Sequence, residues 1–410
     1  MNKLYETPDK MGGKVVYNDG NHKEKTQRKL LIPLLIIGLS LILNQAHLGQ
    51  YYYPGKKAHY TQEYIEENKG KVIVEIPEVY ELANIAIAIT DYGLNSPYRV
   101  YKKGEYYERV LKHFLPFKKH PLISKIEFSD EKLSLYFSFR ENSACYIFKN
   151  DSIIQGGVYP YTWAWSPNLF KKHVKLIEDF AKVSQFSKFY RDNLPYYKKQ
   201  IRKYKEKVPI KKMWTWLEKN FPNRYNCYKI IFSPLIYASH STKRFEDEDF
   251  REIVMFVSGP EIYKNKYSGK VEEGLLSRVV FTEIDHNYVN PITNQYLERV
   301  NKVFSNVEKW NKQSGYPFPF LIFNEYMTWA VFTLYAYDNY EREDFEKINQ
   351  RVVKTMVNSR KFVLFKQFND KFLELYLNRK KDETIPDLYP KILGWVEKIK
   401  SEKRKITTKT

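Results

Sequence analysis

Hydrophobic residues recur at helical spacing in two long stretches of the second half of the chain. Over 275–284 they return every three to four residues, which predicts a largely buried helix. Asn290 precedes Pro291, and a residue before proline avoids the α region, so we expect this helix to end there. Over 321–337 almost every position is apolar, which predicts a helix buried on most faces. Glu325 is the exception, and a buried carboxylate needs a cation, a metal or several donors.

Two short segments before these helices have the β-branched and aromatic composition of strands. They cover 228–232 and 252–258, and the polar residues 239–244 separate them, which predicts a β-hairpin or a pair of strands. Between the two long helices we expect one further helix, from Asn294 to about Lys312.

The first part of the chain mixes both periodicities. Alternation over 72–76 predicts a strand, 106–117 has helical spacing, and 126–148 predicts two or three strands. From Pro167 onward the pattern is mainly helical. A terminal helical layer is expected from three segments, 345–357, 362–377 and 388–399. Together these elements predict an α+β fold.

The expected domain organisation has four parts: a leader 1–50, an α+β N-terminal part 51–165, a helix-rich part 166–400 and a disordered tail 401–410. The leader contains the apolar run 30–43 behind a basic flank. This is typical of a secretory signal peptide, and it is short for a membrane span of ~20 residues. We therefore expect an exported protein, periplasmic or in the cell envelope, with either a cleaved signal peptide or an uncleaved anchor. A buried core helix is the plain alternative.

Composition agrees with a globular protein. The 410 residues are 43% hydrophobic and 17% aromatic, enough for one large core or two modest ones. Cys145 and Cys227 match no zinc-finger spacing and form either one disulfide or two buried thiols. The net charge of +20 comes from 68 basic and 48 acidic residues. Basic residues recur in amphipathic stretches without a nucleic-acid-binding module, so we expect no nucleic-acid partner, and membrane contact only through the N-terminal apolar segment.

The most informative polar residues are Glu283 and His286, one helical turn apart inside the first apolar stretch. The segment matches HExxH with Thr282 in place of the first histidine. In zinc hydrolases that motif places two imidazoles on Zn²⁺, and its glutamate takes a proton from the metal-bound water. Threonine cannot replace an imidazole as a ligand. Either the ligand set has changed, or the chain is a hydrolase-like shell without the chemistry.

Context extends this candidate site. A strand pair, then an ExxH helix, then a second helix carrying a glutamate is the order of zincin-like hydrolases, so Glu325 is a candidate for the last ligand. His240, between the two predicted strands, is a third ligand, a transition-state donor or only a turn residue. His286 has a plain interpretation too, as a hydrogen-bonded core histidine. Asp285 points away from the face of Glu283.

The chain resembles a bacterial family of exported proteins of unknown function, domain of unknown function 4932, whose members are similar to zinc peptidases. The matching stretches span most of 75–340: 75–85, 114–122 with His120, 180–190, 239–242, the ExxH segment, and Asn324 with Glu325. The resemblance implies a zincin-like core between a mixed α/β N-terminal part and a helical C-terminal layer. It also implies a polar cluster of His240, Glu283, His286 and Glu325. The missing first histidine is the departure from the family.

The expected function is a zinc-peptidase-like hydrolase of peptide or protein substrates. Zn²⁺ would be held by His286, Glu325 and His240, with Glu283 as general base and Tyr288 or Tyr326 as oxyanion donor. The first alternative is a catalytically inactive peptidase-like module of the cell envelope. The second is an anchored structural protein whose acidic residues pair with Arg or Lys. The sequence leaves the substrate and the oligomeric state open.

Overall fold

The structure is a computed structural model that describes residues 56–163, 167–263, 266–313 and 316–407, with the backbone alone from 400. These residues belong to one compact unit, Tyr53–Thr410. The apolar run 30–43 and the leader lie outside the described residues. Among the described helices, none is both long enough and apolar enough to cross a membrane.

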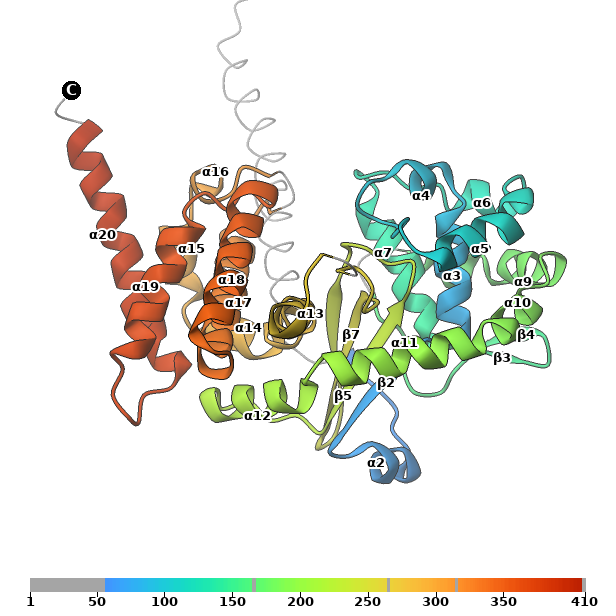
Figure 1. The fold of residues 1–410 in the computed structure, drawn as a ribbon, viewed down its shortest axis with the longest axis horizontal. Coiled ribbons are helices and arrows are strands. Elements are labelled where there is room, and N and C mark those ends of the chain that lie inside the picture. The colour runs from blue at the N-terminus through green and yellow to red at the C-terminus, as the bar shows by residue number, and fades with distance from the viewer. Residues whose placement is uncertain (1–55, 164–166, 264–265, 314–315, 408–410) are drawn as a thin grey trace, which may run out of the picture. The chain divides into compact units, whose positions relative to one another are not determined.

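A five-stranded mixed sheet, in the order β1-β6-β7-β5-β2, forms the centre of this unit (Figure 1). Its strands are β1 (Lys56–Lys57), β2 (Lys71–Glu75), β5 (Cys227–Ser233), β6 (Ser241–Asp247) and β7 (Phe250–Ser258). Strands β2, β5 and β7 are mutually parallel, and β6 runs antiparallel to β7. A separate antiparallel hairpin consists of β3 (Tyr146–Lys149) and β4 (Ser152–Gln155). The mixed α+β class is therefore confirmed.

The two predicted strands are present as β5 and β7, and every residue of β5 is buried, Lys229 included, as is typical of a central strand. They pair in parallel, so the hairpin alternative is wrong. The polar segment between them contains a strand that we did not predict, β6, whose hairpin partner is β7. Strand β2, from the expected N-terminal part, pairs with β5, so this sheet takes strands from both sides of the expected boundary at 165.

Helices make up most of the remaining structure. Before β5 they are α2 (Gln62–Asn68), α3 (Glu78–Ala88), α4 (Asp91–Asn95), α5 (Glu105–Phe114), η1 (Leu115–Phe117), α6 (Pro121–Lys125), α7 (Leu133–Asn142), η2 (Ser143–Cys145), α8 (Leu169–Lys172), α9 (Val174–Val183), α10 (Phe186–Asp192), α11 (Leu194–Lys207) and α12 (Ile210–Asn220). After β7 they are α13 (Gly269–Ile284), α14 (His286–Gln295), α15 (Leu297–Val303), α16 (Val307–Trp310), α17 (Pro319–Asn339), α18 (Arg342–Lys354), η3 (Thr355–Ser359), α19 (Phe365–Leu377), η4 (Ile385–Leu388) and α20 (Tyr389–Thr407).

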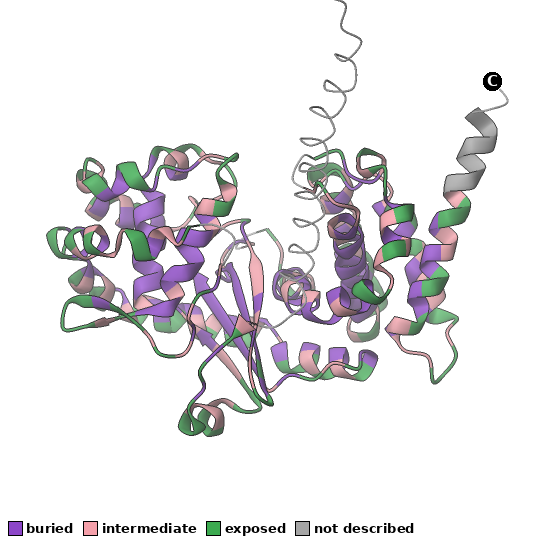
Figure 2. Ribbon diagram, turned by 180° about the vertical axis from the view of Figure 1, so that it is seen from behind, coloured by how far each residue is buried: buried purple, intermediate pink, exposed green. Residues whose placement is uncertain are grey.

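The sheet lies between two groups of helices, with α3 to α10 on one side and α13 to α20 on the other (Figure 1). The long predicted helix over 321–337 is confirmed as α17, which begins with Pro319 and is buried along most of its length (Figure 2). Its position inside the second group explains why nearly every face is apolar. The three predicted C-terminal helices are present as α18, α19 and α20.

The helix that carries the ExxH segment differs from the prediction at its end. Helix α13 ends at Ile284 and α14 continues from His286, with Pro291 inside it. The expectation that Asn290 ends the helix is therefore wrong. Proline has no N–H to give the carbonyl four residues earlier, which belongs to Asn287. The Tyr225 hydroxyl donates to that carbonyl instead, at 2.6 Å, so the proline leaves no buried acceptor without a partner.

Three smaller predictions also differ from the structure. Over 126–148 the chain forms α7 and only one strand, β3, instead of two or three strands. The single helix expected from Asn294 to Lys312 is two short helices, α15 and α16. Cys145 and Cys227 are both buried free thiols, which answers the question that the sequence left open.

Candidate functional site

Three helices bring the predicted site residues together. Glu283 lies in the last turn of α13, His286 is the first residue of α14, and Glu325 lies in the second turn of α17. The Asn287 side-chain amide donates to the Thr242 hydroxyl at 2.9 Å, which fixes the start of α14 against β6. The site therefore lies where these helices meet the sheet.

His286 and Glu325 face each other without a hydrogen bond. The distance from His286 Nε2 to Glu325 Oε1 is 3.9 Å, and the two side chains are 18% and 15% exposed. His286 Nδ1 is 3.3 Å from Asn290 Oδ1. Because an amide oxygen can only accept, Nδ1 carries the hydrogen and Nε2 presents a lone pair. Two acceptors thus point at each other across a gap that a cation or a water proton would fill.

Arg360, directly after η3, meets the carboxylate of Glu325 from the other side. Its Nη1 is 2.8 Å from Glu325 Oε2, and its Nη2 donates to the Tyr316 hydroxyl. Burial alone would raise the pKa of Glu325, but Arg360 and His286 outweigh it and hold that pKa below its usual value. Burial lowers the pKa of His286. At neutral pH the pair is therefore a carboxylate and a neutral imidazole.

Glu283 is in the opposite state. Burial, and then the charge of Glu325, raise the pKa of Glu283 to about 8, against the opposing influence of Arg360 and Lys243. Among the described residues none forms a hydrogen bond with its carboxyl group. At pH 7 this group is mostly protonated, and an added positive charge nearby would favour its ionised form.

Asp285 lies between Glu283 and His286 in the sequence and is fully buried. Neither of its carboxyl oxygens has a hydrogen-bond partner among the described residues. Burial and the neighbouring carboxylates raise its pKa well above the usual range, which favours its protonated form. The structural-protein alternative expected Glu283, Asp285 and Glu325 to pair with Arg or Lys. Only Glu325 does so among the residues described.

His240 comes from the sheet side, immediately before β6. Its Nε2 is 3.2 Å from the Ser258 hydroxyl. Burial, followed by the charges of Arg278 and Arg140, lowers the pKa of His240 to about 3, so the imidazole is neutral. Within the ranges described, no three His, Cys, Asp or Glu side chains are grouped closely enough to hold a metal ion. The structure therefore brings two of the three expected ligands together.

The two tyrosines expected as oxyanion donors have structural partners. The hydroxyls of Tyr288 and Tyr228 hydrogen-bond to each other in the core. Tyr326 donates to the carbonyl of Trp310 at 2.9 Å and accepts from the N–H of Leu364 at 3.1 Å. Tyr316, which we did not predict, is the tyrosine next to Arg360 and in the field of Glu325 and Glu283.

A second buried ion cluster adjoins the site. Glu141 on α7 is fully buried; its oxygens lie 3.1 Å from Lys243 Nζ and 3.1 Å from Arg140 Nη2, and it accepts from the Ser241 hydroxyl. The charges of both Lys243 and Glu141 act on Glu283. Arg360, Tyr316, Lys243 and Glu141 were all missed from the sequence. The one indication was that a buried Glu325 needs a cation, and Arg360 is that cation.

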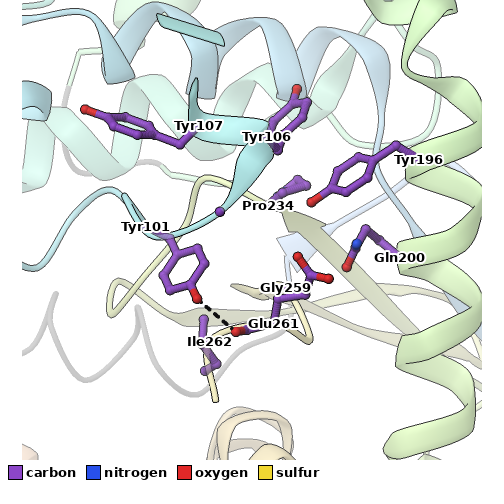
Figure 3. Close-up of a pocket in the computed structure, with 10 residues that line it drawn as sticks. Tyr101, Tyr106, Tyr107, Tyr196, Gln200, Pro234, Gly259, Glu261 and Ile262 are labelled. Atoms are coloured by element: carbon purple, nitrogen blue, oxygen red, sulfur yellow. Dashed lines mark hydrogen bonds between the residues drawn. The ribbon is translucent and has the colours of Figure 1, made fainter. Parts of the chain in front are cut away.

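A tyrosine-lined pocket shares no residue with this cluster (Figure 3). It is lined by Tyr101, Gly104, Tyr106, Tyr107, Tyr196, Gln200, Pro234, Gly259, Glu261 and Ile262. The Tyr101 hydroxyl donates to the carbonyl of Glu261 at 3.0 Å, and Lys203 pairs with the carboxylate of Glu261 at 2.8 Å. These contacts engage Glu261, the charged residue of the pocket, with donors from the protein itself, so the polar cluster remains the candidate site.

The fold and the site thus define an α+β protein with a histidine–carboxylate cluster between its sheet and its C-terminal helices. No family model, no curated protein and no solved structure matches this chain significantly. The resemblance to the zinc-peptidase-like family therefore stays a prediction.

Proposed function

We propose that the protein is a metal-dependent hydrolase with a zincin-like core that cleaves a peptide or related amide outside the cytoplasm. The observation that carries the proposal is the pair of facing acceptors, His286 Nε2 and Glu325 Oε1, 3.9 Å apart. Both groups are in the ionisation states that metal ligands require, a neutral imidazole and a carboxylate.

The surrounding contacts resemble the outer shell of a metal site. Asn290 fixes the ring of His286 through Nδ1, and Arg360 fixes the carboxylate of Glu325 through Oε2. Such contacts orient ligands and select the histidine tautomer. Catalytic zinc sites usually take three protein ligands, and this site offers two. His286 and Glu325 would hold the ion, which would act as a Lewis acid when bound.

The protein's own groups then have defined roles. Glu283 Oε1 or Oε2 would accept a proton from the attacking water, because a nearby positive charge shifts its raised pKa down. Tyr316, held by Arg360, would donate to the developing oxyanion. The expected export, by a signal peptide or anchor at 30–43, belongs to the same proposal.

The test is zinc analysis of the purified full-length chain. We expect about one zinc per chain in the wild type and none in His286→Ala or Glu325→Gln. His120→Ala is the matched control, because His120 also faces a carboxylate, that of Asp179, and its removal should leave the zinc content unchanged. A folded wild type that takes up no zinc from a zinc-containing buffer would contradict the proposal.

One observation favours a second function, the non-catalytic binding module. Thr282 stands at the position of the first histidine, and its hydroxyl donates to the carbonyl of Arg278 on its own helix at 2.9 Å. It therefore adds no third ligand. Glu283→Gln separates the two functions in a screen of peptide hydrolysis: a hydrolase loses turnover and keeps its zinc, whereas a binding module has no turnover to lose.

A further inference from the structure

Two arginines lie over the same indole ring beside the site. Arg278 Cζ is 4.5 Å from the ring centroid of Trp329, and Arg360 Cζ is 5.0 Å from it. Trp329 is 5% exposed, so its ring is a fixed surface for both guanidinium groups. Stacking of this kind holds a guanidinium plane in place before any ligand arrives.

The partners of the two arginines differ. Arg360 is paired with Glu325 at 2.8 Å. Arg278 donates to the hydroxyl of Tyr263 at 3.1 Å, and within the described ranges it has no carboxylate partner. The guanidinium of arginine has five N–H donors in a planar fork, so most donors of Arg278 remain available. Arg278 is only partly buried, which leaves it accessible.

The cations around the site outnumber the carboxylates that pair with them. Four cations act on the cluster and His240, namely Arg140, Lys243, Arg278 and Arg360. Within the described ranges, the carboxylates that pair with these cations are those of Glu141, which contacts Arg140 and Lys243, and of Glu325, which contacts Arg360. A guanidinium without a carboxylate partner, with most of its planar fork available, suits a carboxylate ligand.

We propose that Arg278 binds a carboxylate of the substrate, so that the substrate class is a peptide with a negative group next to the cleaved bond. This group is either the free C-terminal carboxylate or an aspartate or glutamate side chain. This inference rests on the proposed function, because the bound peptide is a substrate only if the protein is a hydrolase. The carboxylate binding itself depends on Arg278 and not on His286 or a metal.

The test uses equilibrium dialysis of three pools of N-acetylated random tripeptides against the full-length chain. The first pool has free C-terminal carboxylates without acidic side chains, the second has amide ends with one Asp or Glu, and the third has amide ends and no acid. We expect one of the first two pools to bind about tenfold or more tightly than the third. Which one binds identifies the source of the carboxylate.

Arg278→Gln should remove that preference, and Arg278→Lys should restore only part of it, because lysine keeps the charge but not the planar fork. The matched control is Arg379→Gln. Arg379 also stacks on an aromatic ring, with its Cζ 3.5 Å from the centroid of Tyr376, and it lies after α19. Equal binding of all three pools, or a preference that survives in Arg278→Gln, would overturn the inference.

Failure of the proposed function gives a different result. Loss of zinc in His286→Ala with an intact peptide preference is expected if both proposals hold. A metal-free wild type that retains an Arg278-dependent preference would remove the hydrolase and keep the carboxylate site. A zinc-loaded wild type without the preference would remove only the carboxylate site.

Discussion

His120 and His286 each face a carboxylate, but the two pairs have opposite proton arrangements. His120 Nδ1 accepts from the N–H of Leu122 at 3.1 Å, so Nε2 carries the hydrogen and donates to Asp179 at 3.0 Å. In His286 the hydrogen lies on Nδ1, and Nε2 stands 3.9 Å from Glu325 as an acceptor. The first pair is complete by itself, and the second lacks a positive partner between its atoms.

The neighbour on the far side of each ring decides this difference. A backbone N–H at the start of α6 makes the first imidazole a donor toward its acid, and the Asn290 amide oxygen makes the second an acceptor. The same two residue types therefore give a capping contact in one place and a candidate ligand pair in the other. Histidine chemistry depends on the second hydrogen bond as much as on the first.

The largest effect should come from removing the cation that the second pair already has. Arg360→Met leaves the carboxylate of Glu325, 15% exposed, without its partner, and we expect a loss of about 3 kcal/mol in the free energy of unfolding. Asp179→Asn at the exposed pair should cost well under ~1 kcal/mol. Urea denaturation with a chelator present measures both. The double variant Arg360→Met/Glu325→Gln should recover part of the loss, and a loss no larger than that of Asp179→Asn would contradict the argument.

The next largest effect should come from placing a histidine at position 282, where HExxH has its first histidine. Thr282→His supplies a third ligand, and we expect zinc affinity, measured by competition with a chelating dye, to rise about 100-fold. Thr282 is 3% exposed, so overpacking will cost about 1–3 kcal/mol of stability. The equivalent change at the closed pair is Ser124→His, one turn after His120. It should gain much less, because His120 Nε2 already donates to Asp179. Equal gains at both pairs would show that the open geometry of His286 is irrelevant.

Measuring the free energy of unfolding at several pH values tests the raised pKa of Glu283. The pKa of Glu283 is about 8 in the folded chain and near 4.5 in the unfolded chain. Between these values the folded state holds more protons, so Glu283 lowers the free energy of unfolding as the pH rises. We expect metal-free Glu283→Gln to match the wild type within about 0.5 kcal/mol at pH 4.5 and to exceed it by about 2 kcal/mol at pH 6. Parallel stability curves for the two proteins would refute the raised pKa.

The smallest effect concerns the two histidines without metal. His120→Ala removes the side-chain cap of α6 and a hydrogen bond to Asp179, which should cost about 1 kcal/mol. His286→Ala removes an acceptor that faces another acceptor, so its cost should be smaller in the presence of a chelator. Thermal unfolding of both variants measures this. When zinc is added, His286→Ala should become the more costly of the two substitutions. Zinc stabilises the wild type by binding at His286, and the variant loses that stabilisation.

The sequence predicted the parts of the site that lie on long regular elements. Helix α17 follows from its apolar pattern, and Glu325, the one carboxylate within the predicted range 321–337, could be placed near His286 from the order of elements alone. Arg360 could not be found, because it follows a π-helical turn and nothing near it in sequence distinguishes it from other basic residues. Its role depends on the contact of its guanidinium with Glu325 on α17, which is a tertiary contact.

The errors in the fold have similar causes. Strand β6 contains Lys243 and Arg244, whose charges look like those of a turn, but burial and pairing with Glu141 make the lysine an interior residue. The parallel pairing of β5 and β7 could not be predicted, because strands that are mostly apolar on both faces have no alternation that indicates their direction of pairing. The helix through Pro291 depends on Tyr225, a residue far away in sequence.

The strand order also determines when this protein can complete its fold during synthesis. Strand β2 pairs with β5, and nearby Tyr64 meets Lys229, 165 residues further along the chain. The backbone groups of strand β2 therefore have no partner strand until the ribosome has synthesised the central strands. A chain that stops before β7 cannot finish the sheet, so early termination should yield an aggregation-prone fragment and not a smaller working domain.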